Sequence, residues 1–145
     1  MGHSCILTSA VLVIAQLGHA APQANSENNT INLDGTWELV RYKYGQTHGV
    51  RAMPNDRREI KLISGTHFVW VIYNLRRKQA TSVGGGTYSL KADHYIEQLD
   101  FGRGLSNNLI GKAQSFKISI DGDKWQQSGI LSNGLIIEET WQRIQ

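Results

Sequence analysis

From residue 36 to residue 143, apolar and polar residues alternate in short runs that turn residues separate. No window of about eleven residues shows the three-to-four spacing of an amphipathic helix. The pattern predicts eight β-strands, at 36–44, 58–64, 66–73, 82–91, 94–101, 112–120, 124–131 and 135–143. Asp121-Gly122 and Asn133-Gly134 are dipeptides that form two-residue hairpin turns, so we expect consecutive strands to be antiparallel neighbours.

The two ends of this series predict that the sheet closes on itself. Gly35-Thr36-Trp37 opens the first strand, and Trp141-Gln142-Arg143 ends the last one. We therefore expect an all-β domain, a single eight-stranded antiparallel up-and-down barrel, in which Gly35, Trp37 and Arg143 take part in closure. Gly84-Gly85-Gly86 permits the bend or bulge that closure needs. A barrel of this size is either filled by side chains or holds one small ligand.

The longest connection that we recognise between strands runs from Gly45 to Arg57. Connections of this length often cover a site. We expect it to lie across one open end of the barrel as a lid.

The alternation also predicts which side chains point into the barrel. Trp37 sets the inner face of the first strand, and the bulkiest apolar residues set it in the others. The apolar residues expected inside are Leu39, Phe68, Ile72, Leu90, Leu99, Phe101, Phe116, Ile118, Ile120, Trp125, Leu131, Ile137 and Trp141. The aromatic and polar residues that could bind a ligand there are Arg41, Trp70, Tyr88, Tyr95, Glu97, Gln114, Gln127 and Glu139.

A buried charge is costly unless it is paired, hydrated or bound to a ligand. Two interpretations of the polar interior follow. In the first, it is a hydrated pocket for a small molecule, with aromatic walls and a few convergent polar groups. In the second, the polar residues satisfy one another in a filled core that binds nothing.

The first twenty residues predict export. They contain no Asp, Glu, Lys or Arg, and an apolar run from Ile6 to Leu17 has the length of a signal-peptide core rather than of a membrane-spanning helix. Gly18-His19-Ala20 offers small residues for cleavage after Ala20. We expect a signal peptide at 1–20, a flexible leader at 21–32, the barrel domain at 33–145, and a secreted or periplasmic protein. An uncleaved anchor or a disordered leader is the alternative, because the start lacks Lys and Arg.

Charge and cysteine content limit the partners and the covalent links that we expect for this protein. The formal net charge is +3, and the basic clusters, Arg57-Arg58 and Arg76-Arg77-Lys78, are short. Nucleic-acid surfaces usually carry longer basic stripes with aromatic platforms, so no nucleic-acid partner is expected. Cys5, the single cysteine, lies in the predicted signal peptide, so the mature domain folds without disulfides. After signal cleavage we expect no stable membrane insertion, and a monomer or weak dimer.

The segment from Leu33 to Val40 resembles the first strand of the lipocalin and fatty-acid-binding protein superfamily, whose shared mark is Gly-x-Trp. In that superfamily an arginine of the last strand packs over this tryptophan, and Arg143 is similar in placement. The ordered motifs more closely resemble small exported bacterial lipocalin-like domains of unassigned function: Gly35-Thr36-Trp37, 66–70, 85–88, 95–97, 127–129 and Glu139-x-Trp141-x-Arg143. Bound fatty acid or retinoid is not implied, because the Gly45 to Arg57 connection is too short for the helical pair of fatty-acid-binding proteins.

Four functions remain open. The first is an exported carrier for a small ligand with an apolar body and a polar tip; Arg41 would favour a carboxylate tip. The second is an enzyme that uses Glu97 and Glu139 as an acid/base pair. The sequence shows no nucleophile motif and predicts no catalytic residue, so an enzyme is less expected than a carrier.

The third possibility is a haem or metal carrier. His48 lies on a loop and His67 and His94 are expected to point outward, so we expect no cofactor and no metal. The fourth is a structural or interaction module with a filled core. Its apolar outer patch would consist of Val40, Tyr42, Val69, Val71 and Tyr73.

Overall fold

The computed structural model describes residues 31–46, 48–105 and 107–145. The predicted signal peptide at 1–20, and all but the last two residues of the predicted leader, lie outside these ranges. Within them, no helix is long and apolar enough to cross a membrane.

The described residues form nine strands and one short 3-10 turn, η1. The strands are β1 (Gly35–Tyr44), β2 (Arg51–Ala52), β3 (Arg57–Ser64), β4 (His67–Asn74), β5 (Gln79–Lys91), β6 (His94–Arg103), β7 (Ala113–Asp121), β8 (Lys124–Ile130) and β9 (Ile136–Arg143), and η1 spans Asn107–Leu109. The eight predicted strands are all present, with ends that differ by three residues or fewer, and β2 is the additional one.

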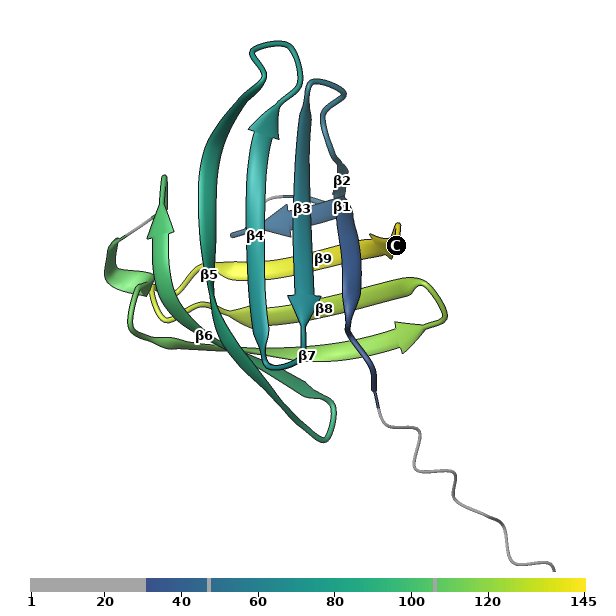
Figure 1. The fold of residues 1–145 in the computed structure, drawn as a ribbon, viewed down its shortest axis with the longest axis vertical. Coiled ribbons are helices and arrows are strands. Elements are labelled where there is room, and N and C mark those ends of the chain that lie inside the picture. The colour runs from purple at the N-terminus through teal and green to yellow at the C-terminus, as the bar shows by residue number, and fades with distance from the viewer. Residues whose placement is uncertain (1–30, 47, 106) are drawn as a thin grey trace, which may run out of the picture. The chain divides into compact units, whose positions relative to one another are not determined.

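The strands form a closed antiparallel barrel, as predicted (Figure 1). Each strand from β3 to β8 pairs with the next, and β1 pairs with both β3 and β9. Trp37 lies opposite Arg143 where the first and last strands meet. On one side, β1 pairs with β3 from Gly35 to Glu38 and then with β2 at Arg41 and Tyr42; on the other side it pairs with β9 from Trp37 to Tyr44. Figure 1 shows β1 bending sharply between its first and second halves.

One end of the barrel is filled by aromatic rings. Trp37, Trp125 and Tyr95 are fully buried, and their rings pack edge to face: the ring centroids of Trp37 and Trp125 are 5.4 Å apart and those of Tyr95 and Trp125 are 5.0 Å apart. Offset and edge-to-face contacts are the favourable geometries for aromatic rings. This packing fills the end of the barrel that contains Trp37 with side chains.

Arg143 closes this end as the sequence predicts. Its guanidinium carbon lies 4.2 Å from the centroid of the Trp37 ring, and its two terminal nitrogens donate to the backbone carbonyls of Asp34 and Asn32. The Trp37 indole N–H donates to the carbonyl of Leu33 at 2.8 Å. The segment before β1 is thereby tied to the last strand.

A β-bulge in β1 overturns the prediction that Arg41 points inward. The register with β9 pairs Leu39 with Trp141 and then Arg41 with Thr140, so Val40 is an extra residue. Because one extra residue reverses the faces of all that follow, Arg41 is exposed, and Tyr42 and Tyr44 turn to the inner side. Tyr42 therefore does not belong to the outer apolar patch that the sequence suggested.

A second bulge, in β6, changes the side of the sheet that its last residues face. Gly85 pairs with Phe101 and Gly86 with Leu99, which leaves Asp100 as the extra residue. The Phe101 ring packs outside, over Gly85, and is 49% exposed, so the prediction that it points inward is wrong. Gly84-Gly85-Gly86 does lie at a bulge, as expected.

The connections also differ from the prediction. The segment from Gly45 to Asp56 contains β2, which pairs along β1 and extends the sheet instead of lining the interior. A second long connection, 104–112, contains η1 and was missed. The Gly111 N–H of this segment donates to the carbonyl of Leu99 at 2.7 Å, which folds the segment back over β6.

Candidate functional site

The barrel encloses a cavity of about 180 Å³ in the half away from Trp37. Its walls combine apolar side chains with three carboxylates and one ammonium group. The lining residues are Tyr44, Glu59, Lys61, Trp70, Ile72, Glu97, Leu99, Leu105, Leu109, Phe116, Gln127, Leu131, Ile137, Glu139 and Trp141. β5 contributes no lining side chain, because its residue facing Trp70 is Gly84.

The mouth of the cavity lies at the end of the barrel where β1 ends and β9 begins. Tyr44 is the last residue of β1, and Ile137 is near the first of β9. Leu105 and Leu109 of the 104–112 connection line the same end. This connection, and not the predicted lid at 45–57, borders the cavity.

The predicted ligand-binding residues divide into three groups. Trp70, Glu97, Gln127 and Glu139 line the cavity. Tyr88 and Tyr95 belong to the filled end, where their ring centroids are 5.1 Å apart. Arg41 lies outside the barrel.

Gln114, the remaining predicted residue, is buried but acts within the fold. Its side chain accepts a hydrogen bond from the Ser132 N–H at 2.8 Å and donates to the Ser132 hydroxyl at 3.1 Å. It thereby fixes the β8–β9 turn against β7.

Lys61 and Glu97 form a buried ion pair, of which only Glu97 was predicted to lie inside the barrel. The Lys61 Nζ is 2.7 Å from a Glu97 carboxylate oxygen, and the Lys61 side chain is 3% exposed. The same nitrogen lies 4.7 Å from the ring centroid of Trp141 and 4.9 Å from that of Trp125. Aromatic faces attract cations, so the barrel supplies its own ammonium group to an aromatic cage.

Glu139 is satisfied by three donors. Its carboxylate accepts hydrogen bonds from the Tyr44 hydroxyl at 2.7 Å, the Gln127 amide at 2.6 Å and the Trp141 indole at 3.1 Å. Burial, and then the nearby Glu139 charge, raises the pKa of Tyr44 far above its ordinary value, so the phenol keeps its proton. Glu97 and Glu139, the proposed acid/base pair, are therefore both engaged by donors of the protein.

Glu59 differs from the other two carboxylates. It is 6% exposed, and its Oε2 atom has no hydrogen-bond partner among the described residues. Burial, and then repulsion from Glu139, raises the pKa of Glu59 to about 8, against the opposing effect of Lys61. Glu59 thus presents a poorly solvated carboxyl oxygen to the cavity.

The sequence match places these residues in a defined family. Residues 32–145 match the sequence model of a family described as a domain of unknown function, DUF4488. The chain belongs to the DUF4488 family. No curated protein matches the chain.

A solved structure shares the fold of this DUF4488 domain. It is an uncharacterized protein from Bacteroides eggerthii, with 15% sequence identity and a TM-score of 0.53. The match covers 77% of this chain and 99% of that chain. At this identity the likeness supports the barrel architecture and nothing further.

Glu59 and Lys61 of the DUF4488 domain escaped prediction because β3 carries the opposite pattern to the other strands. Its apolar Leu62 faces outward and is 48% exposed, whereas the two charged residues are buried. The signal that would have found them is hairpin register. Ser64 pairs with His67 across a two-residue turn, so Lys61 must share the face of Trp70.

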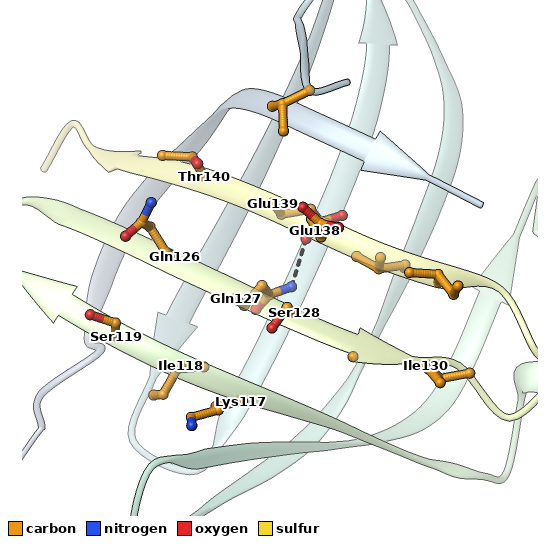
Figure 2. A pocket seen from close by; sticks show the side chains of 14 residues that line it. Lys117, Ile118, Ser119, Gln126, Gln127, Ser128, Ile130, Glu138, Glu139 and Thr140 are labelled. Carbon is orange, nitrogen blue, oxygen red and sulfur yellow. Dashed lines mark hydrogen bonds between the residues drawn. The ribbon is translucent and has the colours of Figure 1, made fainter. Parts of the chain in front are cut away.

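A larger groove of about 640 Å³ lies on the outer side of β7, β8 and β9 (Figure 2). Its side chains, such as Lys117, Gln126 and Ser128, are exposed. Glu138, on its floor, pairs with Lys43 at 2.7 Å. Figure 2 also shows Gln127 joined to Glu139 on the neighbouring strand. Because the buried oxygens of Glu59 and Gln127 that lack a partner among the described residues both belong to side chains lining the interior cavity, we take that cavity as the candidate site.

The described part of the chain contains no group of three His, Cys, Asp or Glu side chains that could hold a metal ion. His48, His67 and His94 are exposed, and the last two point outward as predicted. His94 pairs with Asp93 at 2.8 Å.

Proposed function

We propose that this DUF4488 domain is an exported, lipocalin-like carrier that holds one small molecule in the cavity inside its barrel. The ligand has an apolar body and a polar tip. The observation that carries the proposal is a cavity with mostly apolar walls into which a buried carboxyl oxygen of Glu59 projects without a partner among the described residues. Convergent polar groups in an apolar pocket are typical of small-molecule sites.

The alternative of a self-satisfied polar core accounts for only part of the interior. The Lys61–Glu97 pair and the donors to Glu139 satisfy one another, as that alternative expects. Glu59 Oε2 and Gln127 Oε1 lack partners among the described residues. A buried polar atom without a partner costs about 1–3 kcal/mol, which a bound ligand or water would offset.

The observed position of Arg41 changes the chemistry that we expect of the ligand's polar tip. A carboxylate tip was expected only because Arg41 was placed inside, and Arg41 is exposed. The interior instead presents three glutamates and one lysine.

Native mass spectrometry of the protein isolated from its own source tests the carrier function. We expect a mass excess over the denatured chain that disappears on unfolding. Leu105→Trp, at the mouth, should fill the cavity and abolish the excess, whereas Leu75→Trp, at a position that is 39% exposed, should retain it. A chain that carries no molecule, with only water in the cavity, would refute the proposal.

A further inference from the structure

We propose that the cavity selects small organic ammonium ions, whose N–H groups donate to Glu59 and Gln127 while the apolar part packs against Trp70 and the leucines of the mouth. This inference rests on the carrier function proposed above and names its ligand class. Three properties of the cavity point to this ligand class: the kind of polar atom left open, the charge of the lining, and the size of the cavity.

The polar atoms of the lining that lack a partner are both acceptors. Within the described residues they are Glu59 Oε2 and Gln127 Oε1. The Gln127 assignment follows from its neighbour, since its amide nitrogen must face the Glu139 carboxylate that it donates to at 2.6 Å. Several donors of the lining are engaged within the protein: Lys61 donates to Glu97, and Tyr44 and Trp141 donate to Glu139. A ligand that pairs with the two open oxygens must bring donors of its own.

The charge of the lining favours a cation. Lys61 is neutralised by Glu97 at 2.7 Å. The Glu139 carboxyl group accepts hydrogen bonds from three uncharged groups, with no cation paired to it among the residues of the lining, and Glu59 is a second acidic group beside it. Arg57, near Glu59, offsets part of this charge. An anionic ligand would meet Glu139 and Glu59 without a free cation in the lining, whereas an ammonium ion would be attracted by both.

The size of the cavity limits the ligand to about one ring with a short side chain. Engineered cavities of about 150 Å³ in another protein bind benzene, and this one measures about 180 Å³. Trp70, Phe116 and Leu99 line it and provide apolar contact. Benzylamine, toluene and benzoate have this size and differ in charge, so they are suitable probes.

Binding should also depend on pH through Glu59. The charged and titratable groups that act on it are Glu139 and Glu97, which favour its protonated form, and Lys61 and Arg57, which oppose it. Tyr44, also near, stays protonated. Because an ammonium ion needs the ionised carboxylate, benzylamine affinity should rise about fiftyfold from about pH 6 to about pH 8, as the ionised fraction of Glu59 does for a pKa of about 8.

The experiment is a calorimetric titration of protein produced from the full chain with each probe at about pH 8. We expect benzylamine to bind about tenfold or more tightly than toluene, and benzoate to bind weakest, because hydrogen bonds to a charged group add to apolar contact. Glu59→Gln should remove the preference for benzylamine and its pH dependence and leave toluene affinity unchanged. The matched control is Glu138→Gln on the outer face, which should change none of these values.

Two results would overturn the inference while the carrier function stands. One is equal binding of the three probes, or a preference for benzoate. The other is a Glu59→Gln variant, folded by its circular dichroism spectrum, that keeps the benzylamine preference. If no probe binds and the protein from its source carries no molecule, both the inference and the carrier function are wrong.

Discussion

Glu59 holds a carboxyl group where its charged form is poorly solvated. The group is 6% exposed, and one of its oxygens lacks a partner within the described residues. Desolvation raises the pKa of Glu59 to about 8 from 4.5, and repulsion from Glu139 adds to the rise. A raised pKa in the folded state means that protonation of Glu59 stabilises the fold. This contribution is complete below pH 4.5 and is lost as the pH rises toward 8.

The first prediction follows from the direction of the Glu59 pKa shift. Glu59→Gln removes the titrating group, so the variant should gain stability over the wild type as the pH rises. From about pH 5 to about pH 7 the difference in the free energy of unfolding should grow by roughly 2–3 kcal/mol, at about 1.4 kcal/mol per pH unit. Urea unfolding at the two pH values measures it. A difference that does not change with pH would contradict the assignment, and Glu138→Gln serves as the control.

The second prediction for a single residue concerns Lys61. Lys61→Met should destabilise the domain by about 3–5 kcal/mol, because it leaves Glu97 buried without a counter-charge. The double variant with Glu97→Met should recover most of this loss. Lys43→Met is a matched control: Lys43 also lies 2.7 Å from its carboxylate partner, but the pair is partly exposed, so the loss should stay below about 1 kcal/mol. Urea unfolding of the wild type and these three variants measures the differences in the free energy of unfolding.

Among the elements, β5 is shaped by its three glycines. A Cβ atom on Gly84 would lie 2.5 Å from the Trp70 ring, and one on Gly86 would lie 2.0 Å from the carbonyl oxygen of Gln98. The missing side chains let Trp70 pack against β5 on the inside and let β6 bulge around Asp100. The wall of the cavity at Trp70 therefore depends on β5 having no side chain there.

We predict that Gly86→Ala destabilises the domain by more than about 2 kcal/mol, since the obstructing atom belongs to the backbone and must move with the strand. Ser89→Ala, at an exposed position of the same strand, should change the free energy of unfolding by less than about 0.5 kcal/mol. Thermal or urea unfolding measures both. Similar stability of the two variants would show that the bulge is not a tight constraint.

At the scale of the whole molecule, the barrel is stable because its first and last strands meet. Arg143 lies over the Trp37 ring and donates to the carbonyls of Asp34 and Asn32, which joins the start of the domain to its end. The aromatic core beneath this pair leaves the opposite half of the barrel to hold the cavity.

We predict that Arg143→Ala lowers the free energy of unfolding by about 2–3 kcal/mol, because it removes a cation–π contact and two hydrogen bonds to backbone carbonyls. Arg41→Ala changes the same residue type at an exposed position of β1 and should cost less than about 0.5 kcal/mol. Chemical unfolding measures both variants. Equal losses would mean that closure does not depend on Arg143.

Much of the interior follows from alternation alone. Trp70, Glu97, Gln127 and Glu139 were predicted to share the inside of the barrel, and they line its cavity. The strands of Glu97, Gln127 and Glu139 carry their bulkiest apolar residues on one face and keep a regular register up to these residues; β4, which carries Trp70, is apolar on both faces. Arg41 and Phe101 failed for one shared reason, because each follows a bulge. A bulge depends on the hydrogen bonds of a partner strand, and in β1 that partner, β9, lies about a hundred residues away in sequence.

The eight strands of the barrel, their antiparallel order and the closure of Trp37 against Arg143 could be predicted from the sequence, since they follow from local alternation, turn chemistry and one pair of side chains. Which charges lie inside depends on how the strands pair in three dimensions. Glu59 and Lys61 are buried against the apolar pattern of their own strand, because the hairpin with β4 sets their face and Glu97 on β6 neutralises the lysine. The character of the cavity is a property of strands brought together, and no single strand contains it.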